Sequence, residues 1–346
     1  MLKLILFGGK GGVGKTTCAS AAAVQMAEAG VRTLLLSADP AHSLADCLEQ
    51  EIGPELRPVC GVDGLWAVEL SAEQLYLQFR EEHGAEIGRI LETGTFLDGE
   101  DVTDLLSLPI PGLDEVMGFT KLVDLMLRKE YDLYILDTAP TGHALRLLAL
   151  PDLLDRWIKI LAKIRYKYHY VMSRFAGKEV REAADDFLFT MKRAVKKIHT
   201  LLCDPDQCEF VVVTAPEAMV IAETRRLVKA LDAFGVPVSH IIVNRVISSD
   251  RYNCPFCLER WQGQRGHLRE IEGSFSSHTV LEILEFAHQV RGVKMLRAFP
   301  RLSGLICQAS PAPPGSERKQ RLGANDTQRV RAGGCVASRS PQTANH

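Results

Sequence analysis

Long apolar runs are missing from this sequence, and so is an excess of charge of one sign. No stretch approaches the roughly 18 uninterrupted apolar residues of a membrane-spanning helix. The N-terminus enters a strand-like run at once, without the charged leader and cleavage site of a secretory signal. The 41 lysine and arginine residues nearly balance the 43 aspartate and glutamate residues, giving a net charge of -2. We therefore expect a cytoplasmic globular protein without nucleic-acid partners.

A disulfide framework is also absent. The nine cysteines are scattered along a chain without a secretory signal, which favours free or metal-bound thiols. Only Cys254 and Cys257 have a meaningful spacing, and no cysteine occurs from 61 to 202. The chain contains no internal repeat, and one phosphate-binding motif occurs in it.

Short apolar runs alternate with longer helical patterns along the chain. Most of these runs are too apolar to have one face in water, so they predict strands that are buried on both faces. Strands separated by helices imply right-handed crossovers and a parallel sheet. We predict an α/β fold with a doubly wound, mostly parallel sheet flanked by helices. The runs are LKLILF (2–7), RTLLLS (32–37), LWAVEL (65–70), YDLYILD (131–137), EFVVVTA (209–215), HIIVNRVI (240–247) and TVLEILEF (279–286).

The chain is predicted to consist of one domain, residues 1–302, and a tail. Two stretches, at about 71–128 and 152–202, show helical periodicity outside the simple strand and helix repeat, and they predict an inserted helical subdomain. Residues 303–346 are rich in Pro, Gly, Ser, Gln and Arg and have almost no aromatic or branched apolar residues. Such a segment cannot bury enough surface to offset its ordering entropy, so we expect a disordered tail.

The first strand run leads into GGKGGVGKTT (8–17), which has the Walker A spacing Gly9-x-x-x-x-Gly14-Lys15-Thr16 between a predicted strand and a predicted helix. Backbone N–H groups of such a loop surround phosphates, the lysine reaches the terminal phosphates, and the threonine hydroxyl can bind Mg²⁺. We predict a P-loop NTPase that uses ATP and Mg²⁺; the competing interpretation is a turn without a ligand. The predicted nucleotide-binding residues of the loop are Gly11, Gly12, Val13, Gly14, Lys15, Thr16 and Thr17.

A second lysine, Lys10, precedes the one that the motif requires. It lies on the outer part of the loop, where it can point away from the phosphates held by Lys15. The string GKGGVGKTT resembles the deviant Walker A class, in which the first lysine crosses a twofold interface to the other subunit's nucleotide. The resemblance implies a homodimer in which Lys10 is catalytic in trans, like an arginine finger. The alternative is a solvated lysine.

Two aspartates follow predicted strands at the edge where ligand sites of parallel sheets form. Asp39 begins the string DPAHSLAD, and Asp137 precedes TAPTGHALRLLALP. These segments resemble switch I and switch II of the ArsA/GET family, which contains arsenical pump-driving ATPases and ATPases that target tail-anchored membrane proteins. The resemblance implies that Asp39 aligns the attacking water and that Asp137 holds Mg²⁺ through its water shell. Each aspartate is alternatively a helix N-cap.

Further segments extend the resemblance to about residue 300, among them PGLDEVMGF (111–119), PEAMVIAETRRLVKAL (216–231) and IIVNRV (241–246). In the family the asparagine of the last of these strands contacts adenine, which implies that role for Asn244; a turn-forming asparagine is the alternative. Near residue 289 the family's adenine-side loop usually has a proline and a glutamate, whereas this chain has Ala287 and Gln289.

The pair Cys254 and Cys257, in CPFC, has the spacing of half a structural zinc site, which needs four ligands. No second pair of cysteines or histidines lies nearby at a suitable spacing. A twofold axis would bring two such pairs together, so the motif predicts a zinc ion shared across the homodimer. A redox dithiol and unliganded cysteines are the alternatives.

The single phosphate loop of this chain indicates the branch of the family. Arsenical pump ATPases resemble two fused units with cysteines that bind the metalloid, whereas this chain has one loop and no cysteine from 61 to 202. We therefore predict an ATP hydrolase that delivers an apolar client, such as a tail-anchored membrane protein, to a membrane receptor. The alternatives are an ATPase that drives an arsenite or anion pump and a partition ATPase. The latter predicts a DNA patch or an amphipathic C-terminal helix.

Overall fold

The computed structural model describes residues 3–37, 43–70, 128–138, 199–248 and 255–302, together with short pieces between them. Of the two predicted insertions only such pieces are described, and the predicted tail 303–346 lies outside the described residues. Seven of the eight strands coincide with the seven predicted runs. The strands are β1 (Leu4–Gly8), β2 (Thr33–Ser37), β3 (Arg57–Pro58), β4 (Leu65–Glu69), β5 (Leu133–Asp137), β6 (Cys208–Thr214), β7 (His240–Val246) and β8 (Thr279–Leu284).

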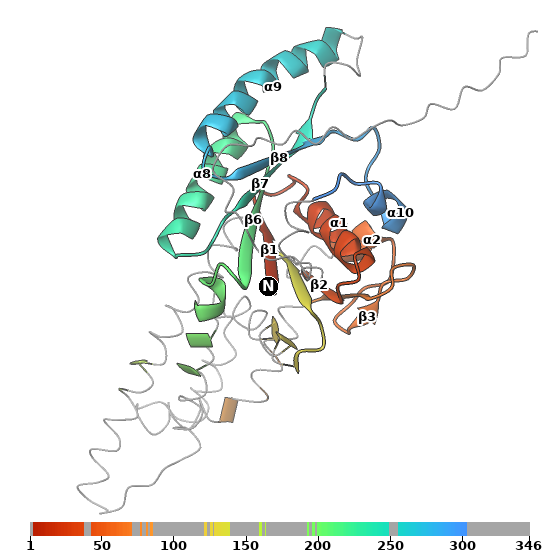
Figure 1. The fold of residues 1–346 in the computed structure, drawn as a ribbon, viewed down its shortest axis with the longest axis vertical. Helices are drawn as coiled ribbons and strands as arrows, with labels where there is room; N and C mark the ends of the chain where they lie inside the picture. Colours follow the sequence, from red (N-terminus) through yellow and green to blue (C-terminus); the bar gives the residue numbers. More distant parts are fainter. Residues whose placement is uncertain are drawn as a thin grey trace, which may run out of the picture.

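The eight strands form one sheet in the order β3-β4-β2-β5-β1-β6-β7-β8. All neighbouring pairs are parallel except β3 and β4, which are antiparallel. Strand β1, the first in the chain, lies in the interior between β5 and β6. The chain therefore winds to both sides of β1, which confirms the predicted doubly wound, mostly parallel sheet flanked by helices (Figure 1).

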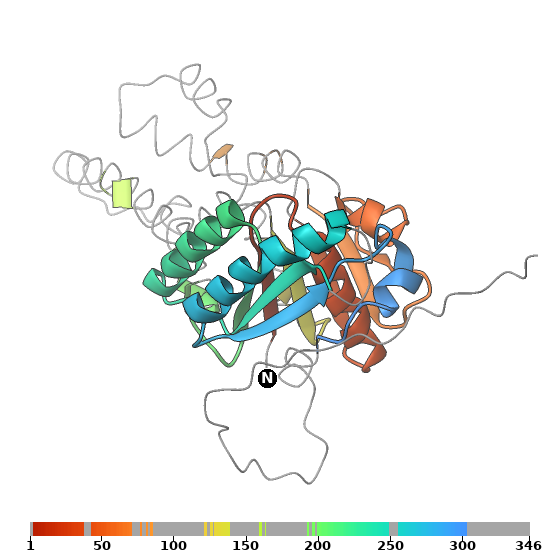
Figure 2. The ribbon, with the colours of Figure 1, turned by 90° about the horizontal axis from the view of Figure 1, so that it is seen from above.

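Helices cover both faces of the sheet (Figures 1 and 2). Alternate residues of β1 point to opposite faces: Ile5 and Phe7 belong to the cluster under α1, whereas Leu4 and Leu6 belong to the cluster under α8 and α9. All four are essentially inaccessible to solvent, which explains why the run contains no alternation of polar residues. The helices are α1 (Lys15–Glu28), α2 (Ser43–Leu48), α8 (Ala218–Ala233), α9 (Pro255–Ser274) and α10 (Gly292–Arg297).

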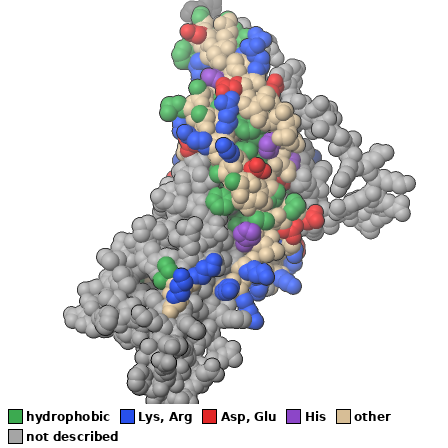
Figure 3. Space-filling model, turned by 90° about the vertical axis from the view of Figure 1, so that its left-hand side faces the viewer, with side chains coloured by type: hydrophobic (Ala, Val, Ile, Leu, Met, Phe, Trp, Pro, Cys, Tyr) green, Lys and Arg blue, Asp and Glu red, His purple; other side chains and the backbone are tan. Residues whose placement is uncertain are grey.

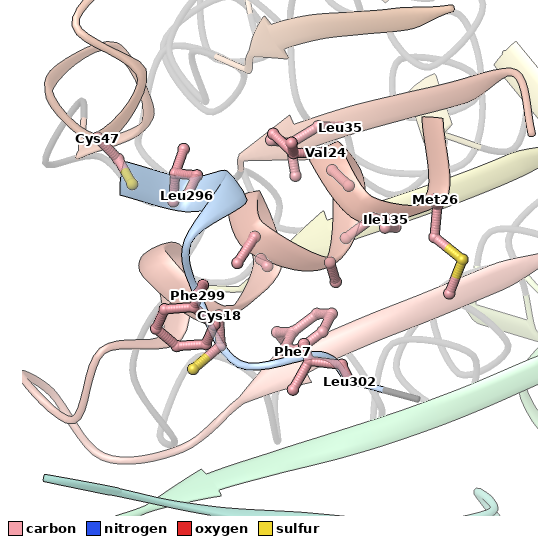
Figure 4. Packing of buried hydrophobic residues seen from close by; sticks show 14 of the residues in the cluster. Phe7, Cys18, Val24, Met26, Leu35, Cys47, Ile135, Leu296, Phe299 and Leu302 are labelled. Atoms are coloured by element: carbon pink, nitrogen blue, oxygen red, sulfur yellow. The ribbon is translucent and has the colours of Figure 1, made fainter. Parts of the chain in front are cut away.

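Helix α1 lies close against the sheet because its buried side is rich in alanine. The sequence of this helix is KTTCASAAAVQMAE, and ten of its residues are buried. Small side chains allow the helix backbone to approach the strands closely, and this fixes the position of the loop that precedes the helix. Figure 4 shows Phe299 and Leu302, from the end of the described chain, packed beside this helix in the same cluster.

The surface mixes charges of both signs. On the face in Figure 3, lysine and arginine side chains gather at the lower part of the described surface, and acidic side chains are scattered among basic ones above it. Within the described part of the chain, no helix is long and apolar enough to cross a membrane.

Candidate nucleotide site

The loop between β1 and α1 has the backbone that the Walker A spacing predicts. Gly9, Gly12 and Gly14 have φ of 154°, 79° and 96°, in the region that residues with a side chain rarely adopt. A Cβ on Gly9 would lie 2.1 Å from the carbonyl oxygen of Val213, and a Cβ on Gly14 would lie 2.4 Å from Nδ2 of Asn244. Two of the glycines are therefore required both by their torsion angle and by the backbone or side chain beside them.

Lys15 opens helix α1 and is buried, with 5% of its surface exposed. Its Nζ lies 3.5 Å from the carbonyl oxygen of Lys10. The ammonium group is thus folded against the loop, at the end of the helix where backbone N–H groups point outward. Lys10 is half-buried, and Gly11 and Gly12 are exposed, so the outer part of the loop faces solvent.

Three oxygen-bearing side chains meet under the loop. The Thr16 hydroxyl donates to Oδ2 of Asp137 at 2.6 Å, and Oγ of Ser43 lies 3.1 Å from Oγ1 of Thr16. Asp137 is fully buried at the end of β5, beside Phe7 of β1 and Ser37 of β2 in the sheet register. Hydroxyl and carboxylate oxygens are the ligands that Mg²⁺ uses next to bound phosphates, so this donor set fits a magnesium ion.

Thr16 and Asp137 were predicted for this place from the sequence, whereas Ser43 was not. The serine lies 27 residues from Thr16 in the chain, in the short helix α2. Serine is too common for its type to attract attention without a structure. The signal that was present is its position in DPAHSLAD, the string that carries Asp39.

Asn244 lies behind the phosphate loop and contacts it. Its Nδ2 donates to the carbonyl oxygen of Val13 at 2.9 Å, and its Oδ1 accepts from the backbone N–H of Arg245 at 2.9 Å. Arg245 has a φ of 62°, which is unusual for a residue with a long side chain. The described contacts of Asn244 therefore hold the loop, and contact with adenine stays a prediction.

Thr17 and Cys18 of α1 lie beside Cys47 of α2. Burial raises the pKa of the Cys18 thiol, and burial also raises the pKa of the Cys47 thiol, against hydrogen bonds from Ser20 and Thr17 that lower it. Both thiols are therefore protonated at neutral pH and behave as small apolar groups. A raised pKa disfavours the thiolate form that a nucleophile or a metal ligand needs.

Some predicted site residues lie outside the described part of the chain. Asp39 and Cys254 belong to this group, and so does the side chain of Cys257, whose backbone is in helix α9. Phe256, between the two cysteines, has 66% of its surface exposed. Among the described residues, no group of three or more His, Cys, Asp or Glu side chains is placed to hold a metal ion.

The amino-acid sequence is similar to that of known proteins over most of the chain. A family model described as anion-transporting ATPase matches residues 2–303. The chain is 34% identical to ATPase ASNA1 homolog 1 of Paramecium tetraurelia over 315 residues, which cover 87% of this chain and 92% of that protein. It is 36% identical over 318 residues to ATPase GET3B of Arabidopsis thaliana, covering 85% and 77%. It is 30% identical over 305 residues to ATPase get3 of Schizosaccharomyces pombe, covering 87% and 91%.

Proposed function

The chain belongs to the anion-transporting ATPase family and is an ATP hydrolase, and from that premise we propose that it works as a Mg²⁺-dependent homodimer. Each cycle of ATP binding and hydrolysis closes and reopens the pair. The cycle controls a surface that binds an apolar client, such as a tail-anchored membrane protein, and delivers it to a membrane receptor. The observation that supports the ATPase chemistry best is the meeting of Thr16 and Asp137 at 2.6 Å under the loop.

The residues of one subunit supply most of the phosphoryl-transfer chemistry. Backbone N–H groups of residues 11–17 and the ammonium of Lys15 surround the phosphates, and this positions the terminal phosphoryl group and neutralises its charge. Thr16 and Asp137 would hold Mg²⁺, Thr16 directly and Asp137 through water, and the bound ion would offset negative charge on the phosphates. Asp39 orients the attacking water, and its position lies outside the described residues. Positioning and charge stabilisation are what phosphoryl transfer mainly needs.

Lys10 completes the site of the other subunit. The loop's outer part, which includes Lys10, is more accessible than Lys15, which is 5% exposed and folded inward. A side chain on this outer part can reach across an isologous interface, as a cation supplied in trans does in other P-loop enzymes.

A shared zinc ion would hold the same pair. Cys254 and Cys257 of each chain supply two thiolates, and two chains supply the four ligands of a closed site. Metal analysis of the purified protein should find one zinc ion for two chains, and Cys257→Ser should remove it. Zinc-free protein that still forms a stable dimer would contradict this part of the proposal.

Exposed apolar residues in the predicted helical insertions support a client surface. Ile160 has 56% of its surface exposed, and Leu77 has 41% exposed. Lys159 and Lys163 are exposed beside Ile160, so positive charge lies next to this apolar side chain. Exposed apolar side chains suit the binding of another apolar segment where they form one patch. The apolar residues Leu161, Ile164, Phe187 and Met191 of the insertion predicted at 152–202 lie outside the described residues.

Co-expression with a tail-anchored substrate tests the client. We expect a complex that elutes as one species in size exclusion, and we expect Ile160→Asp with Leu161→Asp and Ile164→Asp to abolish it. The matched control is Lys159→Asp with Lys163→Asp, which changes charge on the same helix without removing apolar surface. No complex with the wild-type protein, or equal losses in both variants, would contradict the proposed client.

The family description gives one specific reason to keep a second function, the driving of an arsenite or anion pump. Arsenite would then stimulate ATP hydrolysis. Stimulation that persists in variants lacking the exposed Cys60 and the half-buried Cys203 would place the metalloid elsewhere, and an ATPase rate insensitive to arsenite would exclude the arsenite pump.

A further inference from the structure

The carboxylate of Glu69 ties strand β4 to the start of helix α2. Its Oε1 accepts hydrogen bonds from two successive backbone N–H groups, those of Leu44 at 2.9 Å and Ala45 at 3.0 Å. Glu69 ends β4 and has 4% of its surface exposed. The first N–H groups of a helix have no partner within the helix, and a carboxylate there satisfies them and interacts with the helix dipole. Here the carboxylate comes from a residue about 25 positions away in the chain.

The residue that precedes these two N–H groups is Ser43, whose hydroxyl reaches the magnesium donor set. Thr16 has one hydroxyl hydrogen, and it is donated to Asp137. A hydroxyl group offers a single donor and two acceptor positions. The 3.1 Å contact between Ser43 and Thr16 is therefore made by the Ser43 hydroxyl donating to Oγ1 of Thr16. The order of contacts runs from Glu69 through the start of α2 to Ser43 and then to Thr16 and Asp137.

The end of β4 also contacts Ser37, the last residue before the segment 38–42 that precedes α2. The backbone N–H of Leu70 donates to the carbonyl oxygen of Ser37 at 2.8 Å, and Ser37 pairs with Glu69 in the sheet. Ser37 ends β2, and the chain returns to described residues at Ser43. Residues 38–42, which include Asp39, thus lie in the chain between Ser37 and Ser43. On one side Ser37 accepts a hydrogen bond from Leu70, and on the other the two residues after Ser43 donate to Glu69.

We propose that Glu69 is a positioning residue for ATP hydrolysis, holding the Ser43 hydroxyl at the magnesium donor set and fixing both ends of the segment that carries Asp39. This inference rests on the proposed roles of Asp39, Thr16 and Asp137. Glu69 does not touch the nucleotide, and it acts through the backbone of α2. Loss of its acceptor oxygen should release the start of α2 while leaving the phosphate loop in place.

Amide hydrogen exchange without nucleotide tests the structural part directly. In Glu69→Ala the Leu44 and Ala45 amides should exchange at least about tenfold faster than in the wild type, because local opening no longer breaks a hydrogen bond. Glu69→Gln keeps an acceptor oxygen at the same place and should retain most of the protection. Glu51→Ala is the matched control, since that side chain lies between α2 and β3 and is 97% exposed. Equal exchange in the Ala, Gln and control variants would overturn the proposal.

Steady-state kinetics test the functional part. We expect Glu69→Ala to lower kcat by about tenfold or more, since small displacements of groups near the reacting atoms have effects of this size. KM for ATP should stay within about threefold, because the loop and Lys15 still bind the nucleotide. Glu69→Gln should restore most of kcat, and Ser43→Ala should raise the Mg²⁺ concentration needed for half-maximal activity. Equal losses in the Ala and Gln variants would contradict positioning through the acceptor oxygen.

Two outcomes separate this inference from the proposed function. A wild-type protein without Mg²⁺-dependent ATPase activity would refute the proposed function and the inference with it. A wild-type ATPase that Asp137→Asn inactivates, but that Glu69→Ala and Ser43→Ala leave unchanged, would refute the inference alone. Ser43→Ala keeps the test decisive if Glu69→Ala fails to fold, since it removes one hydroxyl from a half-buried position.

Discussion

At the scale of single residues, the phosphate loop depends on contacts that its motif does not reveal. The pattern of glycine and lysine predicts a phosphate site, but Gly14 is also required because Asn244 lies against it, 230 residues away in the chain. Both residues were predicted from the sequence for separate reasons, and no sequence pattern indicates that they touch. Contacts of this kind follow from how β7 is placed beside β6, which no local pattern encodes.

Gly14→Ala should destabilise the protein and weaken ATP binding. A Cβ there would lie 2.4 Å from Nδ2 of Asn244 and would occupy a strained φ of 96°. Gly30→Ala is the control, because Gly30 has a φ of 85° but no atom within 4 Å of the added Cβ. We expect the control to cost about 1 kcal/mol from strain alone and Gly14→Ala to cost roughly 2–4 kcal/mol in urea unfolding.

The second step of that experiment removes the neighbour. In the double variant Gly14→Ala with Asn244→Ala, the clash between the added Cβ and the side chain of residue 244 disappears. The losses in free energy of unfolding measured for the two single variants should therefore not add. If the double variant is destabilised by the full sum of the single effects, the contact between the loop and Asn244 does not limit what position 14 accepts.

An ion pair on the surface makes the stability of the protein depend on pH. The Arg32 guanidinium hydrogen-bonds Asp132 through Nε and Nη2, each at 3.1 Å, and lowers the pKa of that carboxyl below its ordinary value. A lowered folded-state pKa means that the stabilisation is present above the unfolded pKa, about 3.9, and is lost as pH falls through the folded value. The pair is largely exposed, so its effect is small.

Asp132→Asn should therefore cost a constant amount of stability above about pH 5 and progressively less as pH falls below about 4. Urea unfolding of both proteins from pH 7 to pH 2.5 measures this difference. High salt should reduce the difference at neutral pH, because the pair is exposed. A difference that grows on acidification would reverse the sign and refute the assignment.

At the scale of whole elements, the seven longer strands were predicted well and the shortest elements were not. Runs such as YDLYILD and EFVVVTA are buried on both faces, which removes the polar alternation and leaves a clear apolar signal. Strand β3, with two exposed residues, has too little sequence for any pattern. Helix α2 was seen only as part of a resemblance, because six residues are too few for helical periodicity to be recognised.

The segment after helix α10 is fixed to α1 through one side chain. Nε2 of Gln25 lies 3.2 Å from the carbonyl oxygens of Phe299 and Pro300, and Oε1 of Gln25 accepts from the backbone N–H of Leu302 at 3.1 Å. Arg297 adds contacts to Glu28 and to the backbone of Gly61. The end of the described chain is thus part of the core layer over α1.

Gln25→Met should loosen this segment while preserving its packing volume. Losing these hydrogen bonds should cost about 1–3 kcal/mol, and the Leu302 amide should exchange faster with solvent. Gln25→Glu is the matched variant: it keeps the acceptor for Leu302 but places a carboxylate against two carbonyl oxygens. Slower exchange in Gln25→Glu than in Gln25→Met would support the assignment of Oε1 to Leu302; equal exchange would contradict it.

At the scale of the whole molecule, the proposed catalysis depends on two chains acting together. The loop, the magnesium donor set and the buried Lys15 form one half of a site within the chain. Lys10 on the outer part of the loop belongs, in this account, to the site of the second chain. Neither the fold nor the described contacts require a second copy, so the claim has to be tested with mixed subunits.

Mixing two inactive variants tests this claim most directly. Lys10→Glu removes the lysine given to the partner and keeps the subunit's own site, whereas Asp137→Asn disables that site and keeps the lysine. Each variant alone should have almost no ATPase activity. Unfolded and refolded together in equal amounts, they should recover roughly one quarter of wild-type activity, because about half of the dimers are mixed and each has one complete site. A mixture that stays inactive, or a Lys10→Glu protein with full activity, would contradict catalysis across the interface.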